Sequence, residues 1–248
     1  MSNHLNKSSL DTTNDQIAQF LYEHRNEIQN KTLSEIVKES YFSQASFTRF
    51  FQSNKVRSFQ EFKLAFYKHE GEFKQYCSTF IRHIKRIPED QIISKIISSQ
   101  IDNIKAVADI PKEELDKVLD CIHSHKRIIF IGSDLSMSLM TVFQHILMYD
   151  DKNCYLLSDY SGQENMTSRL SKEDLVIVIS IKQRWYSSEM TGNTILNILS
   201  SDAYKMLWTL EDNHKDKDSF DYLFQFGRHI NELGYTQLST LSPILANL

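Results

Sequence analysis

The spacing of apolar side chains in the first third of the chain predicts a small bundle of short helices. From residue 15 to residue 28, apolar and aromatic residues recur every three or four positions, the period of one buried helix face: Ile17, Phe20, Leu21 and His24. Phenylalanines 59, 62 and 66 continue at nearly the same period. An aromatic stripe of this kind is far more often core than a platform for stacked bases, so we assign it to the interior of the bundle.

Two short helices with a tight corner between them are predicted within this bundle. Thr32 and Glu35 form an S/T-x-x-E start signal for a helix over about 33–39. Ser43 offers the N-cap hydroxyl of a second helix, and Phe42 and Phe47 occupy the two positions of a hydrophobic staple around it. The staple fixes the direction in which the chain enters the second helix.

The second helix has one apolar face and one polar face. Phe47, Phe50 and Phe51 have the i, i+3, i+4 spacing of a buried stripe. At roughly 100° per residue, the helix start and the opposite face carry small and polar side chains: Ser43, Gln44, Ala45, Ser46, Thr48, Arg49 and Gln52. Such side chains contact base edges, phosphates and thymine methyl groups. The face is a candidate reader of double-stranded DNA, and a solvated face on a small helical domain is the alternative.

Basic residues flank this helix and are candidate phosphate contacts: Lys55, Arg57 and Lys63. Residues 1–86 hold 13 Lys and Arg against 9 Asp and Glu, a balance of +4, whereas residues 87–248 hold 15 against 23, a balance of −8. A basic head on an acidic body favours nucleic-acid binding by the head, and a chance fluctuation of charge is the alternative.

Beyond the head, the pattern predicts a helical stretch followed by alternating strands and helices. Isoleucines form an apolar stripe on a helix over 90–108, which suits either closure of the second domain or pairing with a partner chain, and Pro111 begins a further helix. Short apolar runs, of which 128–131 and 175–179 are rich in β-branched residues, predict strands at 128–131, 154–157, 175–179, 204–210 and 222–226. Helices are predicted over 135–149 and 187–199. This alternation implies a parallel sheet with helices on both faces. Ligands on such sheets bind at the carboxyl ends of strands, here residues 132–136 and 180–184.

Composition places the chain in an ordinary class. Its 248 residues are 41% hydrophobic and 24% charged, which is typical of a globular protein of one large or two smaller domains. Three widely spaced cysteines fit a reducing compartment better than a disulfide framework, and no Cys or His spacing predicts a metal site. The polar N-terminus and the absence of a long apolar run predict a soluble, cytoplasmic protein without a membrane span.

The segment Phe42-Ser-Gln-Ala-Ser-Phe-Thr-Arg-Phe50, followed by Phe59-Gln-Glu-Phe-Lys63, resembles the signature that heads the RpiR family of bacterial transcription regulators. Members join this head to a SIS domain, a sugar isomerase type of α/β sandwich that binds phosphosugars. The resemblance implies an all-α helix-turn-helix DNA-binding domain over residues 1–80 and a helical linker over 81–108. It also implies a three-layer, SIS-like α/β domain with a parallel sheet over 109–248, for effector binding and dimerisation.

The two ligand loops depart from the family pattern. Where the family has G-x-G-x-S, Asp134 replaces the second glycine, and where it has S-x-S-G-x-T, Trp185 replaces the threonine. A phosphate cradle needs small residues, so Asp134 would repel an anion and Trp185 would crowd it. Side-chain charge is an alternative way to hold an anion. We expect either a pocket that serves only dimerisation or an altered anionic effector bound by Gly132, Ser133, Ser136, Ser180, Lys182 and Arg184.

The leading hypothesis is therefore a dimeric, sequence-specific transcription regulator of carbohydrate metabolism that uses no cofactor and is not an enzyme. Two alternatives stay open. A phosphosugar isomerase needs a positioned general base, and Glu164 and Glu189 lie near the loops but belong to no motif. A SIS-based interaction module without ligand needs neither a base nor an anion.

Overall fold

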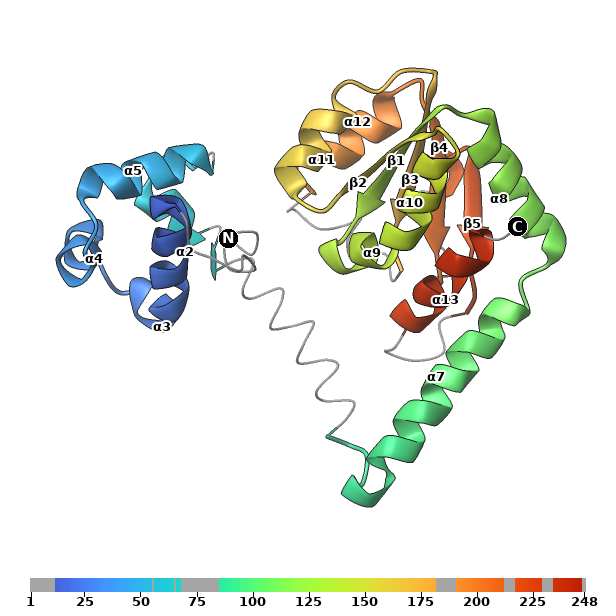
Figure 1. The fold of residues 1–248 in the computed structure, drawn as a ribbon, viewed down its shortest axis with the longest axis horizontal. Coiled ribbons are helices and arrows are strands. Elements are labelled where there is room, and N and C mark those ends of the chain that lie inside the picture. Colours follow the sequence, from blue (N-terminus) through green and yellow to red (C-terminus); the bar gives the residue numbers. More distant parts are fainter. Residues whose placement is uncertain are drawn as a thin grey trace. The chain divides into compact units, whose positions relative to one another are not determined.

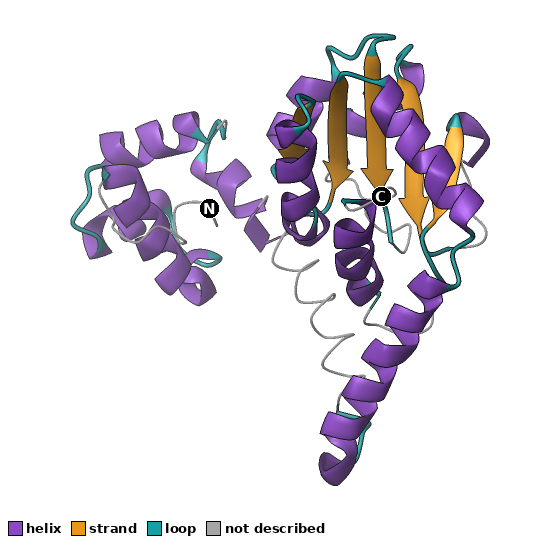
Figure 2. Ribbon diagram, turned by 45° about the vertical axis from the view of Figure 1, so that its right-hand side comes forward, coloured by secondary structure: helices purple, strands orange, loops and turns teal. Residues whose placement is uncertain are grey.

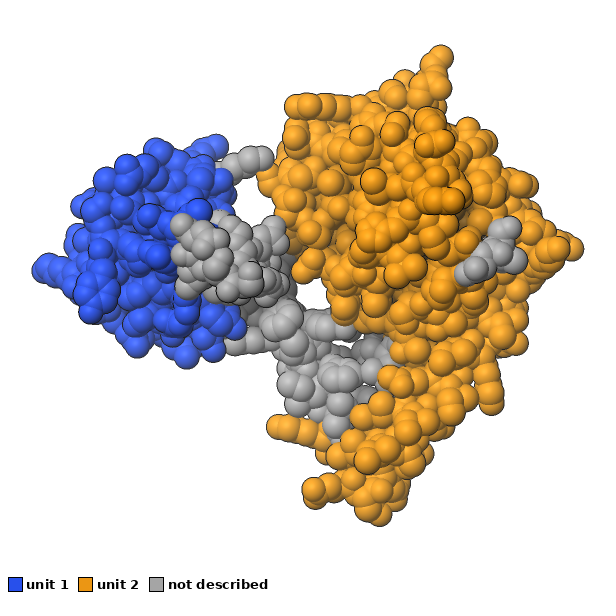
Figure 3. Space-filling model, viewed as in Figure 1, with its two compact units in different colours: residues 1–82 blue, residues 83–248 orange. Residues whose placement is uncertain are grey.

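The structure is a computed structural model that describes residues 12–54, 56–64, 66–67, 85–181, 191–211, 217–228 and 234–246. The chain divides into two compact units, residues 1–82 and 83–248 (Figure 3). The predicted head, residues 1–80, ends close to this division, whereas the helix within the predicted linker, residues 81–108, groups with the second unit. The assignment of separate roles to head, linker and body stays a prediction.

Short helices build the first unit: α2 Thr13–Glu23, α3 Arg25–Ile28, α4 Leu33–Glu39 and α5 Gln44–Ser53, followed by helical residues 59–64 (Figure 1). The helix expected over 15–28 is interrupted at His24, whose backbone N–H donates to the carbonyl oxygen of Phe20 at 3.1 Å and whose Nδ1 lies 2.9 Å from the same oxygen. Those contacts end α2 before the chain turns into α3.

The core of the first unit is one cluster of aliphatic and aromatic side chains. Ile17, Leu21, Ile28 and Ile36 are fully buried. The predicted aromatic stripe lies inside, because the rings of Phe51 and Phe62 have centroids 5.3 Å apart and Phe59 is 8% exposed. The assignment to core is confirmed for Phe59 and Phe62, and Phe66 is half-buried against the same cluster. Phe73, a further candidate of this stripe, lies outside the described residues.

The second unit is built on a parallel five-stranded sheet in the order β2-β1-β3-β4-β5 (Figure 2). Its strands are β1 Arg127–Gly132, β2 Asn153–Leu157, β3 Asp174–Ile179, β4 Tyr204–Thr209 and β5 Tyr222–Gln225. All five predicted strands are present, each within two residues of its expected bounds. Every residue of β3 is buried, as expected for the central strand of a sheet covered on both faces.

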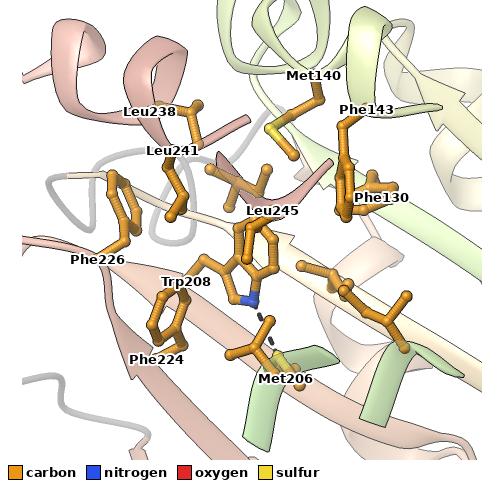
Figure 4. Close-up of a cluster of buried hydrophobic side chains, with 14 of the residues drawn as sticks. Phe130, Met140, Phe143, Met206, Trp208, Phe224, Phe226, Leu238, Leu241 and Leu245 are labelled. Atoms are coloured by element: carbon orange, nitrogen blue, oxygen red, sulfur yellow. Dashed lines mark hydrogen bonds between the residues drawn. The ribbon is translucent and has the colours of Figure 1, made fainter. Parts of the chain in front are cut away.

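Helices cover both faces of this sheet (Figure 2). Side chains of one face, such as Ile129 and Val176, form a core with helices α11 Tyr160–Thr167 and α12 Thr194–Ser200. The other face packs against α8 Lys112–Ser124, α9 Asp134–Leu139, α10 Thr141–Tyr149 and α13 Tyr235–Leu245. Trp208 lies in the middle of this second core, where its indole N–H donates to the sulfur of Met206 at 2.8 Å (Figure 4). The predicted three-layer α/β sandwich is confirmed.

Several helices differ from expectation. The helix predicted over 135–149 is two helices, α9 and α10, separated at Met140, which is fully buried. Helices α11 and α13 were not predicted from the sequence. Of the helix predicted over 187–199, residues 187–190 lie outside the described residues. Helix α7, Ile92–Ala108, packs against α13 (Figure 1).

Candidate functional site

Local capping fixes the position of α5. Thr32 caps α4 by a reciprocal capping box with Glu35, and the Ser43 hydroxyl accepts a hydrogen bond from the backbone N–H of Ser46 at 3.2 Å. The rings of Phe42 and Phe47 meet edge to face with centroids 6.1 Å apart, which is the staple expected from the sequence. These contacts set both the start of α5 and the direction of its exposed face.

The exposed face of α5 carries the predicted polar side chains. Phe47, Phe50 and Phe51 are at most 3% exposed. The residues predicted to contact DNA lie on the outer side or at the helix start: Ser43, Gln44, Thr48, Arg49 and Gln52 are exposed, and Ser46 is half-buried. Whether they contact bases stays a prediction.

The hydroxyl groups on this face are partly engaged within the helix, whereas the amides are free. Thr48 donates to the carbonyl oxygen of Gln44 at 3.0 Å, and the Arg49 guanidinium donates to the Ser46 hydroxyl at 3.4 Å. Within the described part of the chain, the side-chain amides of Gln44 and Gln52 make no hydrogen bond. Two amides and most of a guanidinium fork are therefore available to base edges.

The flanking basic residues have different environments. Arg57 is exposed. The Lys63 ammonium instead donates to the carbonyl oxygens of Gln29 and Lys31 at 3.3 and 3.2 Å, so it closes the end of α3 and is not a free cation. Lys55 lies outside the described residues.

Sequence reasoning missed Tyr41. It lies in the corner between α4 and α5 and is fully exposed. A solvated tyrosine next to a reader helix presents a hydroxyl suited to a phosphate oxygen. The signal that could have found it is its place between the two capped helices, beside the staple residue Phe42.

The predicted ligand loops meet at one edge of the sheet. Strands β1 and β3 are direct neighbours, with Gly132 opposite Ile179, and β2 lies on the other side of β1. After β1 the chain adds β2 on one side and then crosses over to add β3 on the other side. The strand order therefore switches between β1 and β3, and ligands of such sheets bind at this switch point. The structure brings Gly132–Ser136 and Ser180 together at this point.

At the carboxyl end of β1, the serine hydroxyls hydrogen bond to each other. Ser133 caps α9, its hydroxyl lying 2.9 Å from that of buried Ser136. A side chain at Gly132 would bring its Cβ within 2.8 Å of the carbonyl oxygen of Ile179, so glycine is required by the packing of the two strands. Asp134 is exposed on the first turn of α9.

On the β3 side, a buried hydroxyl has no partner among the described residues. Ser180 is 1% exposed, and its Oγ makes no hydrogen bond there. The buried Oε1 of Gln163 on α11 is likewise unpaired, while its amide donates to the carbonyl oxygens of Gly132 and Leu157 at 2.7 Å each. Gln163 was missed because α11 was not predicted. Buried polar atoms without partners are uncommon, and here two of them flank the switch point.

The remaining candidates fall into two groups. Lys182, Arg184 and Glu189 lie outside the described residues. Glu164 on α11 is half-buried, and its Oε1 accepts a hydrogen bond from the amide of Asn193 at 2.7 Å. A carboxylate held in this way is positioned against α12.

Residues 3–70 match the model of the helix-turn-helix domain of the rpiR family. The head is an rpiR-family helix-turn-helix domain. A relative from Clostridium perfringens (strain 13 / Type A), described as an uncharacterized HTH-type transcriptional regulator, is 24% identical over 210 residues, which cover 79% of this chain and 73% of the relative.

Solved structures share the fold beyond the rpiR-type head. The structure of the Vibrio vulnificus NanR protein complexed with ManNAc-6P has a TM-score of 0.52 and 16% identity, and the match covers 99% of this chain and 86% of that one. A protein of Escherichia coli CFT073, solved as a complex, has a TM-score of 0.50 and 14% identity, with 65% of this chain and 93% of that chain covered. The predicted order of an rpiR-type head and a SIS-like α/β unit is confirmed.

The rpiR-type head and the Clostridium perfringens relative support a transcriptional regulator. Among the helices of the described residues, none has the length and apolar character needed to cross a bilayer.

Proposed function

We propose that the protein is a sequence-specific DNA-binding regulator of carbohydrate metabolism. We also propose that an anionic metabolite such as a phosphosugar controls it by binding at the carboxyl ends of β1 and β3. The observation that carries the proposal is the exposed polar face of α5 on a head of the rpiR family. The regulator relative supports it, as does the ligand named for the Vibrio vulnificus protein, ManNAc-6P.

The chemistry of α5 suits the major groove. Arg49 has a planar fork of donors that matches the acceptor edge of guanine, and the free amides of Gln44 and Gln52 suit adenine. Arg57 and Tyr41 supply phosphate contacts, which carry affinity but not sequence preference.

The test is binding of the full chain to a randomised duplex library, followed by affinity measurements on selected sites at several salt concentrations. We expect Arg49→Ala to lower preference for the selected sequence by about tenfold to a hundredfold, because a bidentate contact to a base contributes ~1–3 kcal/mol of discrimination. Arg25→Ala is the matched control: Arg25 lies on α3, at the other end of the head from α5 (Figure 1), over the ring of Tyr22. Equal selectivity of the two variants would remove α5 as the reader.

Two buried polar atoms at the carboxyl ends of β1 and β3 support the proposal that a metabolite binds there. Ser180 Oγ and Gln163 Oε1 are buried without partners among the described residues, and a bound metabolite would hydrogen bond to them. Lys182 and Arg184 follow Ser180 in the chain and supply positive charge for an anionic group. The metabolite controls DNA binding only through unequal affinity for the DNA-competent and DNA-incompetent arrangements.

Thermal unfolding of the full chain with a panel of phosphosugars tests this half. A ligand at 100 times its dissociation constant stabilises the native state by ~2.7 kcal/mol, which is a shift of several degrees. We expect Ser180→Ala and Lys182→Ala to reduce the shift. Ser138→Ala is the control, because its exposed hydroxyl donates to the carbonyl oxygen of Leu135 within α9. If no phosphosugar raises the unfolding temperature, the proposal of a phosphosugar effector is wrong, whereas the proposal of DNA binding is unaffected.

We propose binding rather than catalysis at this edge. An isomerase needs a base within reach of the substrate carbon, and the described candidate, Glu164, is hydrogen bonded to Asn193. Incubation with fructose and glucosamine phosphates should therefore leave the sugars unchanged. Turnover that is lost in Glu164→Gln would replace this part of the proposal by an enzymatic function.

A further inference from the structure

Two neighbouring residues at the end of β3 face opposite sides of the sheet. Val176 and Val178 belong to the core that includes α11 and α12. Ile179 and Ile181 belong to the core that includes α13. By this alternation Ser180 faces α11, whereas Ile181, which is buried, faces α13. A ligand that binds the Ser180 hydroxyl, unpaired among the described residues, therefore acts on a backbone whose next side chain packs on the other face.

The side chain of Ile181 lies beside the start of α13. A Cβ added at Gly234, the residue before α13, would lie 3.3 Å from a side-chain carbon of Ile181 and 2.9 Å from one of Leu210. The backbone N–H of Leu210 donates to the carbonyl oxygen of Ile181 at 3.3 Å. That of Ser180 donates to the carbonyl oxygen of Trp208 at 2.9 Å. The ends of β3 and β4 and the start of α13 therefore pack as one block.

Near its start, α13 holds α7 through a pair of buried amides (Figure 1). Gln237 and Asn103 are both fully buried, and the Gln237 amide donates to the side-chain oxygen of Asn103 at 3.1 Å. Gln237 is also tied to the chain after β5. It donates to the carbonyl oxygen of Arg228 at 2.7 Å and accepts from the backbone N–H of the same residue at 3.2 Å. The Gln237 side chain therefore joins the end of β5 to α7.

The amide pair gives the contact between α7 and α13 discrete states. The residues buried beside Asn103 on α7, Ala106 and Val107, are apolar and make no directional contact. A slide of α7 along α13 would break the hydrogen bond between Asn103 and Gln237 inside the core, which is costly for buried amides. A buried asparagine sets the register of paired helices in coiled coils for the same reason. The placement of α7 therefore changes with the state of this hydrogen bond.

We propose that the Asn103–Gln237 pair couples the carboxyl end of β3 to α7. A ligand at Ser180 shifts Ile181 and the start of α13, and the amide pair passes this shift to α7, which follows the head along the chain. The inference rests on the proposed function for its ligand and names the route of regulation within the second unit. Ile181 and the two amides are positioning residues, because they act through Ser180 and α7.

The first test needs neither ligand nor DNA. Amide hydrogen exchange of the full chain measures local opening of α7, with the amides of β3 as the reference for global unfolding. Ile181→Ala should speed exchange around Asn103 about tenfold relative to β3, because it loosens the block against which α13 begins. Ile131→Ala is the matched control: Ile131 is also fully buried, but it belongs to the core of the other face. Equal exchange of α7 in the two variants would overturn the proposal.

A double-mutant cycle isolates the amide pair. Asn103→Leu removes the acceptor of the pair, and Asn103→Ala does so with a smaller side chain should the first variant not fold. In either background, Ile181→Ala should no longer speed the exchange of α7, because the route is already cut. Val107→Ala is the control background, since it removes a buried apolar contact of α7 but keeps the pair. Effects of Ile181→Ala that are equal in the Asn103 and Val107 backgrounds would contradict the proposed role of the pair.

The second test connects the pair to regulation. The affinity of the full chain for its selected duplex is measured with and without the phosphosugar that raises the unfolding temperature. In wild type and in Val107→Ala the phosphosugar should change this affinity about fivefold or more. In Asn103→Leu the ratio should fall to about one, while the thermal shift and the affinity without phosphosugar persist. An unchanged ratio in Asn103→Leu would overturn the proposal. If no phosphosugar acts on wild type, the proposed effector is wrong, and the exchange measurements alone decide whether the coupling exists.

Discussion

Gly227 shows how a single residue joins distant parts of the second unit. Its φ of 141° is a conformation that only glycine adopts readily, and a Cβ there would lie 1.8 Å from the side-chain oxygen of Gln237. That oxygen accepts from the backbone N–H of Arg228 at 3.2 Å, while the Gln237 amide donates to the carbonyl oxygen of Arg228 at 2.7 Å and to Asn103. Because Gly227, which follows β5, has no side chain, the buried amide of Gln237 on α13 fits beside it.

Gly227→Ala should lower the free energy of unfolding by about 2–4 kcal/mol, because it combines backbone strain with displacement of a buried, hydrogen-bonded amide. Urea unfolding of the full chain measures the change. Gly192→Ala is the control: Gly192 also has positive φ, at 52°, but a Cβ there would meet its nearest atom at 3.5 Å. An equal loss in both variants would show that conformation alone, and not the Gln237 contact, sets the cost.

At the scale of elements, the sequence predicted best where local signals were redundant. Helix α5 was placed correctly because its cap, its staple and its apolar period all agree. The strands were found because runs such as Leu175–Ile179 are buried on both faces and bounded by polar residues. The break at Met140 could not be predicted, since a buried methionine continues the apolar period on which the prediction rests. Gln163 was missed for the related reason that α11 has no strong period.

The capping box of α4 gives a prediction about pH. Hydrogen bonds from the backbone N–H and then the hydroxyl of Thr32, at 2.6 and 2.7 Å, lower the pKa of Glu35 below 4.5. Because the pKa is depressed in the folded state, the carboxylate stabilises α4 above the unfolded pKa, and this contribution is lost as pH falls through the folded pKa.

We therefore expect the Glu35 carboxyl to titrate in NMR spectra of the full chain with a midpoint below 4.5. In Thr32→Ala, which keeps the backbone donor but removes the hydroxyl, the midpoint should move toward 4.5. A midpoint that is the same in both proteins would show that the hydroxyl contributes nothing to the box.

At the scale of the molecule, the dimer expected from the sequence and the proposed reader helix would together constrain the DNA that the protein binds. A two-fold dimer offers two copies of α5, and such proteins bind half-sites about 10–10.5 base pairs apart, or multiples of this spacing. Regulation would then act on the pair of heads, since an arrangement that admits one head but not both loses most of the affinity.

Binding to DNA with two half-sites should therefore weaken when about five base pairs are inserted between them, because half a turn places the second half-site on the opposite side of the duplex. Fluorescence anisotropy on both duplexes measures the loss. If wild type tolerates the insertion while remaining dimeric, the two heads do not engage one duplex in a fixed register.

The hydrogen bond between Asn103 and Gln237 has a practical consequence for building chimeras. Sensor domains are often exchanged by cutting a chain where the sheet domain seems to begin, which here would be after Ala108. A cut at that point would leave Gln237 in the transplanted half without the amide that it contacts on α7, and would strip α13 of its neighbour. A fusion that begins at residue 83 keeps the contact between α7 and α13. It should therefore express as folded protein, whereas a fusion that begins after Ala108 should aggregate.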